Sequence, residues 1–189
     1  MKHLMFSVFL SFAVLSCFAQ DTNELPVLDK SPMDMSYYPN NYPVLKIQDK
    51  VTEPVLARVI YSRPQRNGRI IFGDLVEYGK VWRMGANEAT EIELYKNVKI
   101  GDKKIAKGRY TLYAIPAVDS WTIILNKDTD TWGAFKYDFM KDALRVTVPI
   151  EKLNEPVEAL AIFFEKTGSG CNLVIAWDNI KVNLPINLK

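Results

Sequence analysis

The sequence predicts an all-β protein, an antiparallel β-sandwich of the jelly-roll or immunoglobulin-like type with about nine strands. Two observations indicate this fold class. From residue 55 onward, short segments rich in β-branched and aromatic residues follow one another, and turn-forming residues separate them. No segment keeps an apolar stripe at helical spacing for long enough to predict an amphipathic helix.

The N-terminal residues predict export. Lys2, an apolar run over 4–15 and small residues near Cys17 and Ala19 are typical of a secretory signal peptide at 1–19. The run is shorter than the ~20 apolar residues that a membrane-spanning helix needs. The alternative is a lipoprotein signal in which Cys17 is acylated, and only that alternative predicts membrane attachment. Both predict an exported protein, periplasmic or secreted in the first case.

Residues 20–50 are expected to form a proline- and tyrosine-rich linker, or a segment laid across the domain surface. The prolines and polar residues there show no periodicity, which favours an extended tether. The β-sandwich domain is expected to cover 51–189. The prolines of the linker are Pro26, Pro32, Pro39 and Pro43, and Tyr37, Tyr38 and Tyr42 are able to attach it to the domain.

Turn signals divide the domain into its strands. Asn67-Gly68 predicts a hairpin between the first two strands, and Asp178-Asn179 predicts one between the last two. Tight turns are also expected at Gly101 and Gly108. We expect strands at 55–62, 69–73, 91–95, 120–126, 144–150, 157–165, 171–178 and 180–186, with further strand segments beside Gly101 and Gly108.

Histidine and cysteine usage excludes several kinds of active site. The chain has one histidine, His3, and two cysteines, Cys17 and Cys171. Cleavage after residue 19 would leave no histidine, which excludes a Ser-His-Asp triad and a histidine-containing zinc site. It would also leave Cys171 as the single cysteine, which we expect to be a small buried residue in a strand. Any general base would then be a carboxylate, a lysine or a tyrosine.

Charge and acidic spacing exclude other classes of ligand. The net charge of +2 gives no basic surface of the kind that nucleic acids or anionic membranes require. Asp128 and Asp130 alternate like calcium ligands, but they lack the glycine and terminal glutamate of an EF-hand loop. The sequence therefore predicts no nucleic-acid partner, no metal site and no cofactor.

Polar and aromatic residues gather in segments that interrupt the strands. Arg63 lies in a group with Arg66 and Arg69, which predicts either an anion site or a solvated hairpin tip. A second group lies at 126–138, where Trp132 gives the loop an aromatic face that either packs or binds.

The stretch KVWRMGANEAT, residues 80–90, is the densest of these groups. Trp82 offers a stacking face and Arg83 a planar cation, while Asn87 and Glu88 supply polar atoms, a combination common in sites for small polar ligands. The alternative is structural, with Trp82 in the core and Arg83 paired with a carboxylate. The candidate ligand-binding residues are Arg63, Trp82, Arg83, Asn87, Glu88 and Trp132.

The motifs YSRPQRNGRIIFGDLVEYGKVWRMGANEAT, KGRYTLYAIP, WTIILNKDTDTWGAFKYD and WDNIKVNLPI occur in this order between Pro54 and Ile186. In this respect the chain resembles the bacterial domain-of-unknown-function family numbered 2911. The resemblance implies an exported, strand-rich protein, but no activity and no catalytic residues. The chain has Met84 where the family pattern usually has threonine, which favours a structural role at that position.

Three functions fit these observations. The leading hypothesis is a non-catalytic exported module that binds a small anionic or polar ligand, a glycan or an envelope component. The first alternative is a structural or assembly protein that docks another envelope protein. The second is a carboxylate-dependent hydrolase, in which Glu88 would be the acid or base and Arg83 would stabilise a developing anion.

Overall fold

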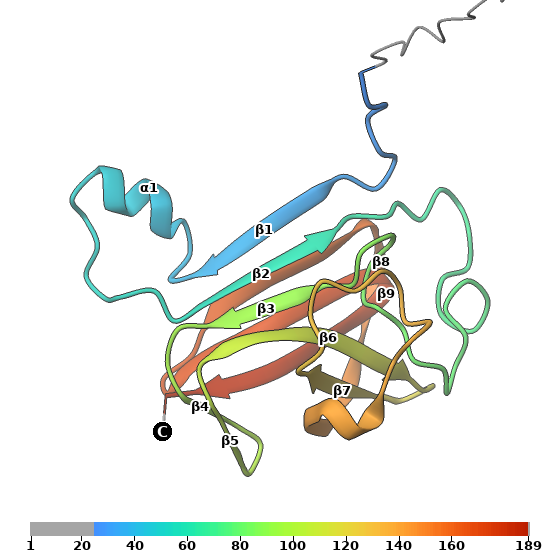
Figure 1. The fold of residues 1–189 in the computed structure, drawn as a ribbon. Helices are drawn as coiled ribbons and strands as arrows, with labels where there is room; N and C mark the ends of the chain where they lie inside the picture. The colour runs from blue at the N-terminus through green and yellow to red at the C-terminus, as the bar shows by residue number, and fades with distance from the viewer. Residues whose placement is uncertain (1–24, 189) are drawn as a thin grey trace, which may run out of the picture.

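The computed structural model describes residues 25–188, so the predicted signal peptide, with His3 and Cys17, lies outside the described residues. The prediction of an antiparallel, sandwich-like all-β fold is confirmed, and nine strands form one sheet in the order β1-β2-β3-β6-β7-β8-β9-β4-β5 (Figure 1). The elements are β1 (Met33–Tyr38), α1 (Tyr42–Ile47), β2 (Ala57–Ser62), β3 (Glu91–Leu94), β4 (Val98–Ile100), β5 (Lys103–Ile105), β6 (Gly108–Pro116), β7 (Ser120–Asn126), the 3-10 helix η1 (Phe139–Lys141), β8 (Asp142–Lys166) and β9 (Gly170–Asn187).

The long strand β8 folds this sheet into two layers. Its first part pairs with β7 as far as Pro149, and from Ile150 onward it pairs with β9. The register shifts twice between Lys152 and Ala161, as it does at β-bulges, which bend a strand and increase its twist. In Figure 1 the layer that contains β9 therefore lies behind the layer of β1, β2 and β3.

Aromatic residues fill one region of the core between the layers. The indole rings of Trp82 and Trp177 stack, with centroids 5.9 Å apart and planes at 18°. Trp121 meets Trp82 edge-on at 5.7 Å, and the Phe72 ring lies 4.9 Å from Trp121. Two of these rings, Phe72 and Trp82, come from the irregular segment 63–90, so this loop is part of the core.

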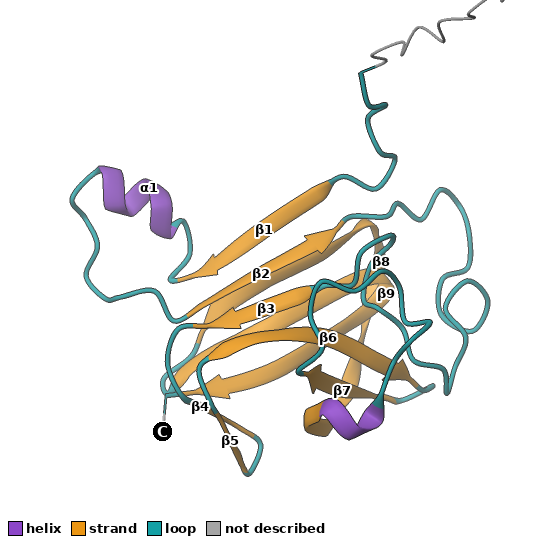
Figure 2. Cartoon of the chain, in the orientation of Figure 1, coloured by secondary structure: helices purple, strands orange, loops and turns teal. Residues whose placement is uncertain are grey.

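The two long irregular segments, 63–90 and 127–138, lie at the end of the sandwich away from α1, where Figure 2 draws them as loops. They touch through their backbones, because Glu88 and Trp132 form an isolated antiparallel bridge. The predicted groups at 80–90 and 126–138 are therefore neighbours.

The predicted hairpin between 55–62 and 69–73 is wrong. Its turn exists, with Asn67 and Gly68 both at positive φ, but the following residues form only a bridge between Phe72 and Val76. The segment after β2 instead pairs with the second half of β8, where Leu160 N donates to Pro64 O at 3.0 Å. This tertiary pairing takes the place of the local hairpin.

The predicted hairpin at Asp178-Asn179 is also wrong, because both residues lie within β9. Asp178 has φ +52° and opposes Val157 at the point where the register of β8 shifts. The Arg66 guanidinium lies 2.9 Å from the Asp178 carboxylate. The strands expected at 144–150 and 157–165 likewise join within β8.

The segment 20–50, expected to be a linker or to lie across the domain surface, contains β1 and α1. Strand β1 pairs with β2 over six residues, and its buried Tyr38 ring lies 6.2 Å from that of Phe164. Pro32 and Pro39 flank β1 and do not interrupt it, which is where strands tolerate proline. Helix α1 follows, and none of its residues is buried. No helix within residues 25–188 is long and apolar enough to cross a membrane.

Candidate functional site

The loop 80–90 is built around residues that point inward. Trp82 is 7% exposed and Met84 is fully buried. The backbone of Trp82 exchanges two hydrogen bonds with Ala114 of β6, at 2.7 and 2.9 Å. Thr90 donates its amide to Arg83 O at 3.1 Å and its hydroxyl to Met84 O at 2.7 Å. Residues 82–84 are therefore held from both sides.

A second anchor lies at the turn of this loop. The Ser62 hydroxyl donates to Ala86 O and accepts from Ala86 N, both at 2.6 Å. A Cβ atom on Gly85 would lie 2.6 Å from Ser62 Oγ, so only glycine lets the loop approach β2 this closely. Met84 and Asn87 both have positive φ, at +57° and +58°. The loop is a specific structure in which Trp82 and Met84 face the core.

Arg83, between these inward residues, lines a cavity of about 260 Å³, the Arg83 cavity. Its other walls include the indoles of Trp82 and Trp177, the aliphatic side chain of Leu75 and the polar side chains of Ser31 and Arg69. The lining contains two arginines and no carboxylate. The cavity therefore combines an apolar wall with an excess of positive charge.

The guanidinium of Arg83 has no partner among residues 25–188. No hydrogen bond or ion pair joins it to another described residue, and its Nε is both inaccessible to solvent and unbonded. Burial lowers the pKa of Arg83, with no neighbouring charge to oppose the effect.

Each of the other arginines of the described chain has at least one hydrogen-bond or ion-pair partner, although the Nε atoms of Arg58 and Arg66 are also buried without a hydrogen bond. Arg69 donates to the backbone carbonyls of Arg66 and Gln65. Since a partly buried cation without a counter-charge is costly, Arg83 is the anomaly of this region. The arginines that pair with a carboxylate are Arg58, Arg63, Arg66, Arg109 and Arg145.

The structure brings Trp82 and Arg83 together and places the other predicted residues elsewhere. Arg63 pairs with Asp34 at 3.0 Å and donates to Leu160 O at 3.1 Å, so it joins β1 to β8. Arg63 thus has a carboxylate partner, whereas Arg83, for which such a partner was the structural alternative, has none in the described chain.

Asn87, Glu88 and Trp132 form a second group. The Nδ2 of Asn87 donates a hydrogen bond to Asp29 Oδ2 at 2.9 Å, and the Asn87 carbonyl oxygen accepts one from Gly133 N at 3.0 Å. Glu88 is exposed, and the Trp132 side chain is 61% exposed. None of the three lines the Arg83 cavity, so the six predicted residues do not share one site.

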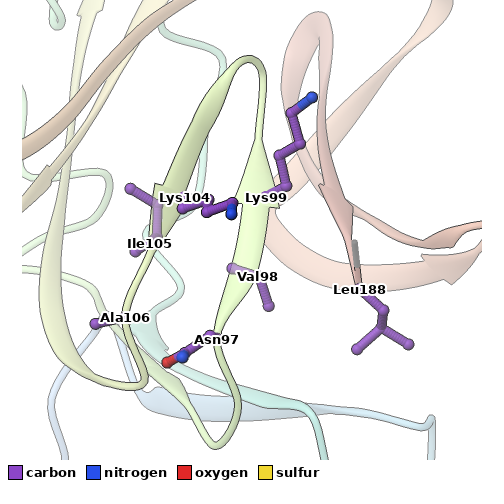
Figure 3. A pocket seen from close by; sticks show the side chains of 7 residues that line it. All are labelled: Asn97, Val98, Lys99, Lys104, Ile105, Ala106 and Leu188. Carbon is purple, nitrogen blue, oxygen red and sulfur yellow. The ribbon is translucent and has the colours of Figure 1, made fainter.

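A larger cavity, of about 440 Å³, lies between the β4–β5 hairpin and Leu188 (Figure 3). None of the predicted residues lines it. The Lys99 side chain extends away from that of Lys104, so the two amino groups do not converge on one point (Figure 3). Without convergent polar groups this cavity is a weaker candidate than the Arg83 cavity.

The aspartates of the loop 127–138 are engaged in ion pairs. Asp128 lies 2.9 Å from Lys141 Nζ, and Asp130 lies 2.6 Å from the Arg109 guanidinium. Within residues 25–188 no group of three or more histidine, cysteine, aspartate or glutamate side chains is arranged to hold a metal ion.

Comparison with protein families gives a match over residues 43–186, to the family described as "Protein of unknown function (DUF2911)". The chain belongs to this family. The DUF2911 region extends from α1 through most of β9 and includes Arg83, Trp82 and Trp177. It excludes β1 and the preceding segment, which supplies Ser31 to the cavity. Comparison with curated proteins and with solved structures gives no significant match.

The sequence did not predict that Arg69, Trp177 and Ser31 line the cavity with Trp82 and Arg83. Arg69 had a signal, since it belongs to the arginine group 63–69 within the DUF2911 motif. Trp177 lies in β9 and Ser31 in the expected linker, and neither carries a local signal. Their contribution depends on the packing of β9 against the loop 80–90 and on the pairing of β1.

Proposed function

We propose that this protein is a non-catalytic binding module for a small ligand with a carboxylate, phosphate or sulfate group, held in the Arg83 cavity. The observation that supports this is the partnerless guanidinium of Arg83. An anionic ligand would supply the missing counter-charge through charge-assisted, bidentate hydrogen bonds.

The lining of the cavity also favours a ligand with an apolar part. Trp82, Trp177 and Leu75 give the lining an apolar part beside its two arginines. At about 260 Å³ the cavity is slightly smaller than the roughly 300–1,000 Å³ of drug-sized sites. These properties fit a single acid group on a small ring or a short chain.

Binding is better supported than hydrolysis. The lining includes no carboxylate, lysine, tyrosine or cysteine that could act as a general base. Glu88, the candidate acid or base of the hydrolase hypothesis, is not among the lining residues. The expected export of the protein, which belongs to this proposal, is supported by the sequence pattern of residues 1–19.

Thermal unfolding in the presence of anions tests the proposal. Phosphate, sulfate, acetate and benzoate would be added at constant ionic strength to the wild type and to Arg83→Met, which keeps the aliphatic stem. A ligand at about a hundred times its Kd stabilises the folded state by about 2.7 kcal/mol. We expect at least one of these anions to raise the Tm of the wild type but not that of Arg83→Met.

Arg145→Met is the matched control, because Arg145 is an arginine of β8 that pairs with Asp142 and does not line the cavity. Its anion-dependent Tm shift should equal that of the wild type. An equal shift in all three proteins, or no shift with any of the anions, would contradict the proposal.

A further inference from the structure

A third cavity lies on the loop 127–138, at the same end of the sandwich as the loop 80–90. Its volume is about 520 Å³, and its lining contains both aromatic and polar side chains. Trp132 is 61% exposed and Phe135 is 85% exposed, which is unusual for side chains of this size. We call it the Trp132 cavity; its polar lining includes Asp128, Thr131 and Lys136.

The backbone of this loop is held in place. Asp130 N donates to Glu91 Oε1 at 2.6 Å, and Ala89 N donates to Thr131 O at 3.0 Å. Gly133 N donates to Asn87 O at 3.0 Å. Thr131 and Gly133, on either side of Trp132, are therefore hydrogen-bonded to the loop 80–90. The exposed indole of Trp132 thus extends from an ordered backbone.

Gly133 lets the Phe135 ring lie against the backbone. It has φ +68°, and a Cβ atom there would lie 2.6 Å from the Phe135 ring. The ring therefore rests on the glycine while its other side faces solvent. Beneath the loop, the buried Tyr113 hydroxyl lies 3.1 Å from Thr131 Oγ1.

We propose that the Trp132 cavity binds a saccharide, with a pyranose ring stacked on Trp132 and Phe135. Aromatic faces beside hydroxyl and carboxylate groups match the apolar faces and hydroxyl edges of a sugar ring. Lys141 binds one oxygen of Asp128, Oδ1, which leaves its second oxygen able to accept a sugar hydroxyl. Lys136 and Thr131 supply donors. This proposal is independent of the anion site.

The composition of the lining distinguishes a saccharide from a protein partner. Phe139 and Met140 of η1 are also exposed, but neither lines the cavity. A flat apolar surface for protein docking would include them, whereas a sugar needs only the concave part. Both lining aspartates are neutralised by ion pairs, to Lys141 and to Arg109, which favours an uncharged ligand.

Tryptophan fluorescence gives a direct test. Of the four tryptophans, Trp82, Trp121 and Trp177 are buried, so acrylamide quenches chiefly Trp132. The probes are trisaccharides of glucose, galactose and N-acetylglucosamine. We expect at least one of them to lower the quenching constant of Trp132. Arg83→Met should show the same protection, which separates this test from that of the anion site.

Variants decide between the two kinds of partner. Loss of one stacking ring in Phe135→Ala should raise the Kd for the protecting sugar about tenfold, and Phe139→Ala should leave it unchanged. Absence of protection by every trisaccharide overturns the proposal. Equal weakening by Phe135→Ala and Phe139→Ala also overturns it, and would indicate an apolar docking face.

Discussion

Burying the charged Arg83 side chain lowers the free energy of unfolding, and this loss can be measured without knowing the ligand. Burial lowers its pKa with no opposing charge, so the charged side chain destabilises the ligand-free fold at every pH at which it is protonated. Arg83→Met keeps the stem and removes the charge. We expect its free energy of unfolding, measured in urea, to equal or exceed that of the wild type.

Arg66→Met is the contrasting variant. It removes the partner of the mostly buried Asp178 carboxylate, which lies 2.9 Å from Arg66 Nε, and should cost about 1–3 kcal/mol. If Arg83→Met destabilised the protein as much as Arg66→Met, the Arg83 guanidinium would have a structural role.

Cys171 should be unreactive in the native protein. As its sequence context predicts, it is buried in a strand, and burial, with a smaller effect of Glu53, raises the pKa of its thiol to about 12. Reactivity requires the thiolate and access to it. Mass spectrometry of the Cys171 peptide should show labelling by iodoacetamide only after unfolding. Native labelling at the rate of a free thiol would contradict this.

At the scale of elements, the approach of the loop 80–90 to β2 depends on Gly85. Gly85→Ala would place a Cβ atom 2.6 Å from Ser62 Oγ, and we expect a loss of about 1–3 kcal/mol in the free energy of unfolding. Gly168→Ala is the control, since a Cβ there meets nothing within 4 Å. Equal urea midpoints for the two variants would show that the loop adapts.

The strands whose sequence pattern is bounded by local turns could be predicted. Residues 120–126 coincide with β7 and 91–95 nearly coincide with β3, because alternation and turn residues are both local. The prediction of a hairpin turn at Asp178-Asn179 is wrong because the same residues suit a hairpin turn and a bulge. Strand β1 was missed because its flanking prolines resemble those of a linker.

The candidate site likewise has a part that the local sequence predicts and a part that depends on tertiary packing. Trp82 and Arg83 are adjacent in sequence, and their shared cavity follows from one loop. The proximity of Ser31 and Trp177 to them depends on β1 and β9, which lie far away in the chain. Trp132 was predicted to bind together with Arg83, and the structure places it at another cavity.

For the whole molecule, stability should vary little between about pH 5 and pH 8 and then fall in alkali. Residues 25–188 contain no histidine. Burial raises the pKa values of Tyr61, Tyr113 and Cys171. These acids keep their protons in the folded chain at a pH where the unfolded chain has lost them.

The decline should therefore begin near the unfolded pKa values, about 8.5 for cysteine and about 10 for tyrosine. The stabilising contribution is fully present below these values and is lost as the pH rises towards the folded pKa values. Urea unfolding at a series of pH values measures it. A free energy of unfolding that stayed constant in strong alkali would show that these groups are not protected.

The continuity of β8 determines how the molecule can open. The single strand Asp142–Lys166 belongs to both layers. The two layers are therefore covalently continuous through β8 and cannot separate along it. We expect separation of the layers to start at the edge strands, β1 and β5. Ser31, on the Arg83 cavity, lies two residues before β1. Fraying of this margin, and not a hinge between rigid halves, would then set the rate at which a ligand enters and leaves.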